Sequence, residues 1–480
     1  MNGAMSKADP SVDGVQQKLV AYAESLTYER LPAKTILDAK IRIVDTLGAL
    51  IGGFFDEPCV IARTMAADVP VVGGATIFGT GYRTTPDLAA FVNSTTSRSV
   101  EMNDVAHRHG GRNGHPSDVI APILGVGEFV HASGRDVLTA VVLAYEVYLR
   151  LAESISTPAF DAANFCCLGT AIASGRLLGL DGKQLAQCIS MAVIPNNALN
   201  QTRTGQLSMW KAVASGQSSR SGVFAALLAR RGMEGPNQPF EGKHGWCNHV
   251  GKTALTLPTW GGGEVPFRIG DTVIKPRAAC FHTLSPILSA EKAAAQLGAR
   301  LGEVSNVKVE VYRASERTMS NVGSGNNAAG NPWWNPESRE TADHSIPYCV
   351  AAALFDGTVT KDSFDDAHLS NGELRALLSK VDIVENDEFT AGYDGWPVRH
   401  RTRVSVTLVG GARIVGDCGG DYGDLGDSKS EAEISAKFRA LAENALGAWQ
   451  VDRILEQLWR FEDIPDVSVL PPMLVLEGMG

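Results

Sequence analysis

Apolar residues recur at three- and four-residue spacings from about residue 16 to residue 265, with short breaks between the runs. This spacing places the apolar side chains on one face of an α-helix. Clear examples are the runs at 37–47, 137–145 and 222–230. Many of the runs are rich in Ala and Gly, which allows neighbouring helices to approach closely. The pattern therefore predicts a large, all-α helical domain.

The periodicity changes after about residue 267. Apolar and polar residues alternate at 307–311 and again at 404–408, which predicts strands. Gly410 and Gly411 then precede a further strand-like run that begins at Arg413, as in a β-hairpin. Helices are predicted within the same region at 284–298 and 373–380. Strands mixed with helices indicate a smaller α+β domain.

The helical period returns from about residue 429. The simplest architecture is a mainly α protein in which residues 1–266 form the first part of the helical domain, residues 267–426 form an inserted, smaller α+β lid domain, and residues 427–480 complete the helical domain. A chain of 480 residues is long enough for two such domains.

Composition narrows the class of function. The formal net charge of −10 is spread along the chain without long runs of one sign, which argues against nucleic acid and anionic membranes as partners. The first residues lack the apolar core of a signal peptide, and no run of about 18 apolar residues occurs. We therefore expect a cytoplasmic protein, in which any anionic ligand needs a local cluster of cations.

Several kinds of cofactor have no recognisable site in the sequence. The eight cysteines are scattered, and none has the spacing of a zinc, redox or iron–sulfur motif, so we expect reduced structural thiols. Nucleotide-binding glycine motifs, the G-x-S-x-G elbow and the H-E-x-x-H motif are also absent from the sequence. We expect side chains to carry the chemistry, with no cofactor and no metal.

The densest polar segment runs from Glu101 through Asp104 to His115, just before an apolar helical run. Pro116 follows His115, and proline is favoured at the first position of a helix. His115 is therefore expected near a helix N-terminus, where a bound anion is stabilised. The alternative interpretation is that His115 only caps the helix. Its proximity to several acids and histidines favours a functional site.

Three later segments also combine charged residues with apolar helical runs. Lys211 begins a helix of small residues, where it either extends to the surface or faces a cavity. Lys275 and His282 lie in the second segment, and the third runs from Arg339 to Tyr348. Each is consistent with ordinary surface polarity. Together they indicate a cleft between the two domains.

These segments resemble those of the MmgE/PrpD family, which includes 2-methylcitrate dehydratases, cis-aconitate decarboxylase and iminodisuccinate epimerase. The matching blocks are Asn103-Asp104 with 115–118, 208–211 with 224–233, 239–245, 275–282 and 342–348. Each block is weak alone, but they are ordered and spaced over nearly the whole chain.

The resemblance implies a homodimer with a cofactor-free site between the domains for a small polycarboxylate substrate. The site residues that it implies are Glu101, Asp104, His115, Lys211, Lys275, His282 and Tyr348. Proton abstraction beside a carboxylate requires fixed cations and an acid–base pair. We predict Lys211, Lys275 and His115 as carboxylate binders, and His282 with Tyr348 as the proton-transfer groups.

Some positions depart from the family pattern. Glu101 stands where Asp is usual, Val105 where Thr is frequent, and Ala162 near the position of a histidine that many members carry. The missing histidine leaves His107 or His109 as substitutes, or indicates a different proton-transfer reaction. The leading hypothesis is a lyase, a dehydratase of a 2-methylcitrate-like hydroxy polycarboxylate. The alternatives are an epimerase, isomerase or decarboxylase of a small di- or tricarboxylate, and a carboxylate-binding protein without catalysis.

Overall fold

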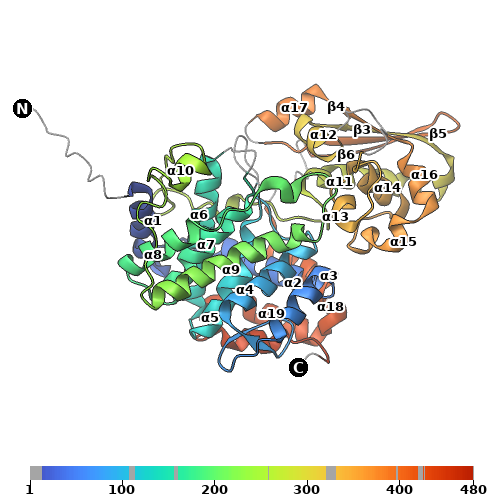
Figure 1. Cartoon of the computed structure of the whole chain (residues 1–480). Coiled ribbons are helices and arrows are strands. Elements are labelled where there is room, and N and C mark those ends of the chain that lie inside the picture. Colours follow the sequence, from blue (N-terminus) through green and yellow to red (C-terminus); the bar gives the residue numbers. More distant parts are fainter. Residues whose placement is uncertain are drawn as a thin grey trace, which may run out of the picture.

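The computed structural model describes residues 13–106, 114–155, 160–257, 259–320, 331–395, 398–419, 425 and 428–478. The described chain is mainly α-helical, as predicted, and forms two large hydrophobic cores. The first core draws residues from 15–274 and from 434–476, whereas the second draws on 273–425 together with Val105. Figure 1 shows the two regions beside each other, with the sheet in the second.

Helices build the first core because their apolar faces turn toward one another. The main helices are α1 (Gly14–Ser25), α2 (Ala33–Gly52), α3 (Glu57–Ala67), α4 (Pro86–Ser99), α5 (Ile120–Phe129), α6 (Gly134–Ser154), α7 (Ala163–Leu177), α8 (Gly182–Val193), α9 (Trp210–Arg230) and α10 (Trp246–His249). A short hairpin joins β1 (Ala75–Thr76) to β2 (Arg83–Thr84). Capping boxes at Ser133 and Asp181 begin α6 and α8.

The end of the chain returns to the first core through α18 (Glu431–Leu446), α19 (Ala448–Trp459) and α20 (Leu470–Met473). Helix α18 lies against α2, so the red and blue ribbons meet in Figure 1. This close approach depends on glycine: a Cβ at Gly48 would lie 3.2 Å from the Phe438 Cα, and one at Gly52 would lie 2.8 Å from the Leu441 side chain. The small residues of α2 thus allow the two ends of the chain to pack together.

The second core surrounds a mixed sheet with the strand order β4-β3-β5-β6. Strand β3 (Val304–Val311) pairs parallel with β4 (Val381–Glu385) and antiparallel with β5 (Thr402–Leu408), which pairs with β6 (Arg413–Cys418). The predicted hairpin is confirmed, because Gly411 adopts a positive φ of 82° in the turn between β5 and β6. The remaining helices are α11 (Phe281–Leu297), α12 (Arg313–Met319), α13 (Arg339–Ala342), α14 (Ile346–Asp356), α15 (Asp366–Leu369), α16 (Gly372–Leu378) and α17 (Asp387–Asp394).

Helix α11 begins earlier than predicted, and the difference has a local reason. The sequence pattern predicted it at 284–298, but it begins at Phe281, and Pro286 lies inside the helix. A proline has no N–H to donate to the carbonyl four residues back, which here is that of His282. The buried Ser315 hydroxyl donates to this carbonyl at 2.8 Å instead. The helix therefore passes through the proline with its backbone acceptor satisfied.

A backbone pairing joins the two regions beside the polar segments. Val105 and Val273 form an antiparallel bridge, with N–H to carbonyl distances of 3.0 and 2.9 Å. Val105, which stands where the family often has Thr, contributes its side chain to the second core. The bridge aligns the segment after α4 with the segment before α11, so that Glu101 and Lys275 come together.

Candidate functional site

Glu101 lies at the centre of a buried polar cluster just beyond the end of α4. Its side chain contacts the Arg98 guanidinium, three residues earlier, and only 1% of Glu101 is exposed. Its backbone has a φ of 58°, in the left-handed region that a residue with a Cβ rarely adopts. Strain of this kind costs about 1–3 kcal/mol and is typical of functional sites.

Two buried lysines bring further positive charge to Glu101. The Lys275 Nζ lies 2.5 Å from one carboxylate oxygen of Glu101 and donates to its backbone carbonyl at 3.1 Å. The Lys211 Nζ, from α9, lies 3.6 Å from the other carboxylate oxygen. Burial opposes ionisation, but Arg98, Lys275 and Lys211 hold the pKa of Glu101 well below its ordinary value. The carboxylate is therefore held ionised among cations.

His115 faces the same cluster from the beginning of the 3-10 turn Pro116–Val119, which leads into α5. Its Nδ1 lies 2.8 Å from the Asp104 carbonyl, and its Nε2 lies 2.9 Å from the Arg98 guanidinium. Because a carbonyl can only accept and a guanidinium can only donate, the proton belongs on Nδ1. Burial, followed by the charges of Arg98 and Lys275, lowers the pKa of His115 well below its ordinary value, so the ring is neutral.

Asp104 and Asp118 hold the turn that carries His115 in place. One carboxylate oxygen of Asp104 accepts from the Ser117 backbone N–H at 3.1 Å, and the other accepts from the Tyr145 hydroxyl at 3.0 Å. Asp118 accepts from the Asn103 amide at 2.7 Å. Burial raises the pKa of Asp118 to about 6. These contacts fix the turn that carries His115. The side chain of Asp104 therefore has a structural role and does not contact the cations described above.

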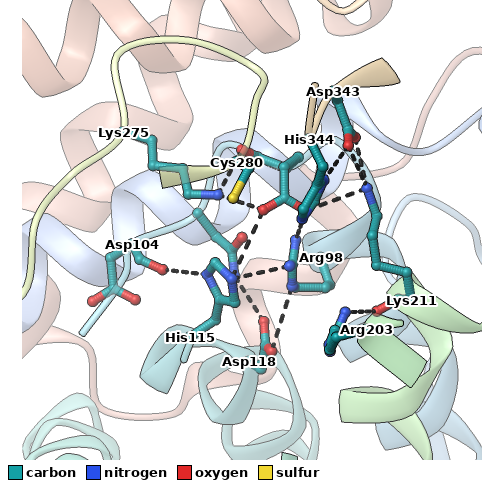
Figure 2. Close-up of polar contacts among 12 residues, drawn as sticks. Arg98, Asp104, His115, Asp118, Arg203, Lys211, Lys275, Cys280, Asp343 and His344 are labelled. Atoms are coloured by element: carbon teal, nitrogen blue, oxygen red, sulfur yellow. Dashed lines mark hydrogen bonds and ion pairs between the residues drawn. The ribbon is translucent and has the colours of Figure 1, made fainter. Parts of the chain in front are cut away.

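The second region contributes Asp343 and His344 from the residues that follow α13. The Lys211 Nζ donates to both carboxylate oxygens of Asp343, at 2.6 and 2.8 Å. The Nδ1 of His344 contacts the Asp343 carboxylate, and His344 also hydrogen-bonds the side chain of Cys280. Figure 2 shows these side chains converging with Lys275 on Arg98 and His115. The cluster therefore joins both regions of the chain.

The predicted proton-transfer groups lie elsewhere. The Tyr348 hydroxyl donates to the Ser363 carbonyl at 2.9 Å, and its ring packs in the second core near Phe364. Tyr348 faces away from the cations because it lies inside α14 and on its core side. The structure does not bring it to the cluster.

His282 is the second residue of α11 and lies among aromatic rings. Its Nδ1 lies 3.1 Å from the Tyr312 hydroxyl, and the rings of Phe281 and Tyr393 surround it. Burial lowers the pKa of His282 to about 3, with smaller contributions from His400 and His344. His282 is thus a neutral ring whose described hydrogen bond and ring contacts are with aromatic side chains of the second region.

The departures from the family pattern have different outcomes. Ala162 is beside the site: a Cβ added at Gly114 would lie 2.6 Å from the Ala162 Cβ and 2.0 Å from the Tyr148 hydroxyl. Ala162 thus lies close to the chain at His115, where a histidine side chain would approach the cluster. His107 and His109, the suggested substitutes, lie outside the described residues.

A cavity of about 760 Å³ adjoins the cluster at Lys275 and Met102. It lies between α2 and α18 on one side and residues 358–362 on the other, and its lining includes Arg277, Lys361 and Lys437. This volume is within the range of small-molecule sites. Inside the cluster, the buried Nε of Arg98 has no hydrogen-bond acceptor in the described part of the chain. An unsatisfied buried donor of this kind leaves room for a ligand or water oxygen.

Several members of the cluster were not chosen from the sequence. Arg98 was missed, although an arginine three residues before Glu101 in a helix of small residues was an available signal. Asp118, Cys280, Asp343 and His344 lay within quoted segments but were not selected as site residues, because spacing alone does not show which side chains meet. Within the described ranges, no group of three or more His, Cys, Asp or Glu side chains has the geometry to hold a metal ion. A search of the same residues finds no helix with the length and hydropathy of a membrane span.

In comparisons with known proteins, most of the chain matches two protein domains of one family. Residues 17–256 match the MmgE/PrpD N-terminal domain, and residues 278–460 match the MmgE/PrpD C-terminal domain. Human cis-aconitate decarboxylase is 25% identical, over 96% of this chain and 94% of its own length. The mitochondrial 2-methylcitrate dehydratase of Yarrowia lipolytica is 26% identical over 84% of this chain and 78% of its own. The 2-methylcitrate dehydratase of Escherichia coli is 25% identical over 85% of each.

Proposed function

Because the chain belongs to the MmgE/PrpD family, we propose that it is a lyase that dehydrates a 2-methylcitrate-like hydroxy polycarboxylate by removing a proton beside a carboxylate. The observation that carries this proposal is the arrangement around Glu101. Arg98, Lys211 and Lys275 converge on a single buried carboxylate, and His115 lies 3.8 Å from it. This concentration of buried cations supports the binding of a substrate carboxylate.

The same arrangement supports the chemistry. Removing a proton beside a carboxylate creates negative charge on that carboxylate, and fixed cations stabilise it as it develops. The lysines and Arg98 are held in place before any substrate arrives, because each is already paired in the cluster. The cationic lining of the adjoining cavity would accept further carboxylates. A substrate carboxylate would displace or share the partners of Glu101.

The test is direct. The purified protein is incubated with citrate or 2-methylcitrate, and the ultraviolet absorbance of the enoate product is followed. Lys275→Met should abolish turnover because it removes a fully buried cation that contacts the Glu101 carboxylate. Lys292→Met, which alters a lysine that contacts the Asp417 carbonyl at the surface of the second region, should leave turnover unchanged. Folded wild-type protein that produces no enoate from either compound would refute the dehydratase proposal.

Decarboxylation is the second candidate, favoured by the human relative, whose match covers 96% of this chain. Release of CO2 from cis-aconitate would identify it. Epimerisation requires proton transfer but no leaving group, which suits a site with Ala162 near the usual histidine. It would appear as deuterium incorporation into a dicarboxylate without loss of water or CO2.

We also propose that the protein is a homodimer. Apolar side chains on α3 and α9, which pack against each other, are exposed: Ile61 by 55%, Met65 by 45% and Phe224 by 51%. Light scattering should then give twice the 51.0 kDa mass of the chain. Ile61→Glu should produce a monomer, whereas Val409→Glu in the β5–β6 turn should not. A wild-type monomer at micromolar concentration would contradict this proposal.

A further inference from the structure

Cys280 has surroundings that differ from those of the other buried cysteines. It is the residue immediately before α11, a helix of 17 residues, and its backbone N–H donates to the Asp343 carbonyl at 2.8 Å. This contact holds Cys280 beside the residues that follow α13. Its side chain hydrogen-bonds His344, and Figure 2 shows the sulfur among the cations of the cluster.

The charges around Cys280 favour a thiolate. The N-terminus of a long helix stabilises negative charge and promotes ionisation of a cysteine. Burial opposes ionisation, but the charge and hydrogen bond of His344, together with Lys275, lower the pKa of Cys280 below its ordinary value. By contrast, burial raises the pKa of Cys166 and of Cys349, which have no imidazole partner in the described structure. These cysteines are similarly buried, but their pKa values shift in opposite directions because their neighbours differ.

His344 is oriented to serve this thiol. Asp343 occupies its Nδ1, which leaves Nε2 for the sulfur of Cys280. Asp343 is itself fixed by Lys211, at 2.6 Å. Burial disfavours the imidazolium, but Cys280 and Asp343 outweigh it and raise the pKa of His344 to about 8. A carboxylate that orients a histidine, which in turn activates a nucleophile, is a recurring catalytic arrangement.

We propose that Cys280 is the base that removes the substrate proton and that His344, oriented by Asp343, is the acid paired with it. This assignment rests on the proposed function and names the groups that perform it. It takes the place of the predicted pair, His282 and Tyr348, whose described hydrogen bonds are with the Tyr312 hydroxyl and the Ser363 carbonyl. His115 is not chosen because both of its ring nitrogens are engaged, by Asp104 and by Arg98.

Cys280 and His344 together account for both proton transfers of a dehydration. The Cys280 thiolate takes the proton beside the carboxylate, and the electrons of that C–H bond form the carbon–carbon double bond. The C–O bond breaks, and the departing hydroxide takes the Nε2 proton of His344 and leaves as water. The Cys280 thiol then passes its proton to the neutral His344. Thiolate and imidazolium are restored, and no outside proton donor is needed.

The ion pair can be tested without substrate. A thiolate absorbs in the ultraviolet, so the difference in absorbance between the wild-type protein and Cys280→Ser is measured against pH. We expect the thiolate signal to be present already near pH 7. In His344→Asn it should emerge only above pH about 8.5, the ordinary value of a cysteine, because burial then opposes ionisation without the imidazole to offset it. Equal titrations in the wild-type protein and His344→Asn would overturn the proposal.

The catalytic role is tested by turnover and by exchange of the substrate proton with deuterium oxide. Cys280→Ser should lower kcat by roughly 100- to 10,000-fold, the contribution typical of a general base, with little change in KM. His115→Asn should instead raise KM. Cys349→Ser is the matched control, because its thiol is buried in the same region and contacts the Ala342 carbonyl at 3.4 Å. It should keep wild-type kcat.

The outcomes separate the two proposals. Turnover and exchange that survive in Cys280→Ser would overturn the assignment of the base and leave the proposed function standing. Wild-type protein without turnover or exchange on any of the polycarboxylates would refute the proposed function, and the catalytic role of Cys280 with it. Thermal stabilisation of Cys280→Ser by citrate, as large as that of the wild-type protein, would show that the variant is folded and binds the ligand.

Discussion

Glu101→Gln tests whether one buried carboxylate compensates the charges of the cluster. Glutamine keeps the shape of the side chain but removes its charge, leaving Arg98 and Lys275 without their carboxylate partner. Both cations are essentially inaccessible to solvent, with exposures of 2% and 0%. Breaking a buried pair by neutralising one member costs about 3–5 kcal/mol, since the remaining charge is left uncompensated. Urea denaturation should show a loss of this size near neutral pH.

The direction in which this loss of stability changes with pH follows from the pKa of Glu101. The pKa of Glu101 is depressed in the folded protein, mainly by Arg98 and Lys275 acting against burial. Its contribution is therefore fully present above the unfolded value of about 4.3 and is lost as the pH falls through the folded pKa. The gap in unfolding free energy between the wild-type protein and Glu101→Gln should be constant from pH 5 to 7 and narrow in more acidic solution.

Citrate provides the decisive comparison. If Glu101 occupies the position of a substrate carboxylate, its neutral replacement should leave the cations free to bind citrate, which should recover much of the lost stability. Glu128→Gln is the control. Glu128 is equally buried and pairs with Arg83, at 2.9 Å, but lies outside the cluster. Glu128→Gln should also be destabilised, but citrate should not restore its stability. Equal citrate effects on both variants, or an undiminished stability of Glu101→Gln, would refute the reasoning.

Three further changes follow from the contacts of single residues. Tyr348→Phe removes the hydrogen bond to the Ser363 carbonyl and should cost about 1 kcal/mol in urea denaturation with kcat unchanged; a large fall in kcat would restore Tyr348 as a catalytic group. Ser315→Ala leaves the His282 carbonyl without a donor and should cost about 1–3 kcal/mol, whereas Ser305→Ala, at the exposed start of β3, should cost less. Because burial raises the pKa of Asp118 to about 6, the stabilisation present at low pH is lost as the pH rises through that value. The wild-type protein should therefore lose about 3 kcal/mol relative to Asp118→Asn between pH of about 4 and 6, and parallel stability profiles would contradict this.

The overall fold was largely predictable because hydrophobic period reports directly on which face of a helix or strand is buried. The alternation at 404–408 and the glycines that follow correctly predicted a hairpin. Helix starts were less predictable: Pro286 marks no boundary because Ser315, distant in sequence, satisfies the carbonyl that the proline leaves free.

The candidate site was predictable in its segments but not in its contacts. The resemblance named Glu101, Lys211 and Lys275, and the structure brings them together. It also named Tyr348, whose position inside α14 turns the hydroxyl toward Ser363. Whether a helical residue faces a core or a cluster depends on the rotation of that helix against its neighbours, which spacing does not specify.

The pairing of charges across the two regions constrains how this protein can vary. Lys211 on α9 is neutralised by Asp343 beyond α13, and Glu101 beyond α4 is neutralised by Lys275 beside the Val105–Val273 bridge. Each region therefore carries buried charge that is balanced in part by the other, although Arg98 of α4 also pairs with Glu101. A chimera that takes its helical part from one relative and its α+β part from another can therefore leave buried charges in one part without their partners in the other. The two parts of the chain must evolve together, and a change on one side is tolerated only with its counterpart on the other.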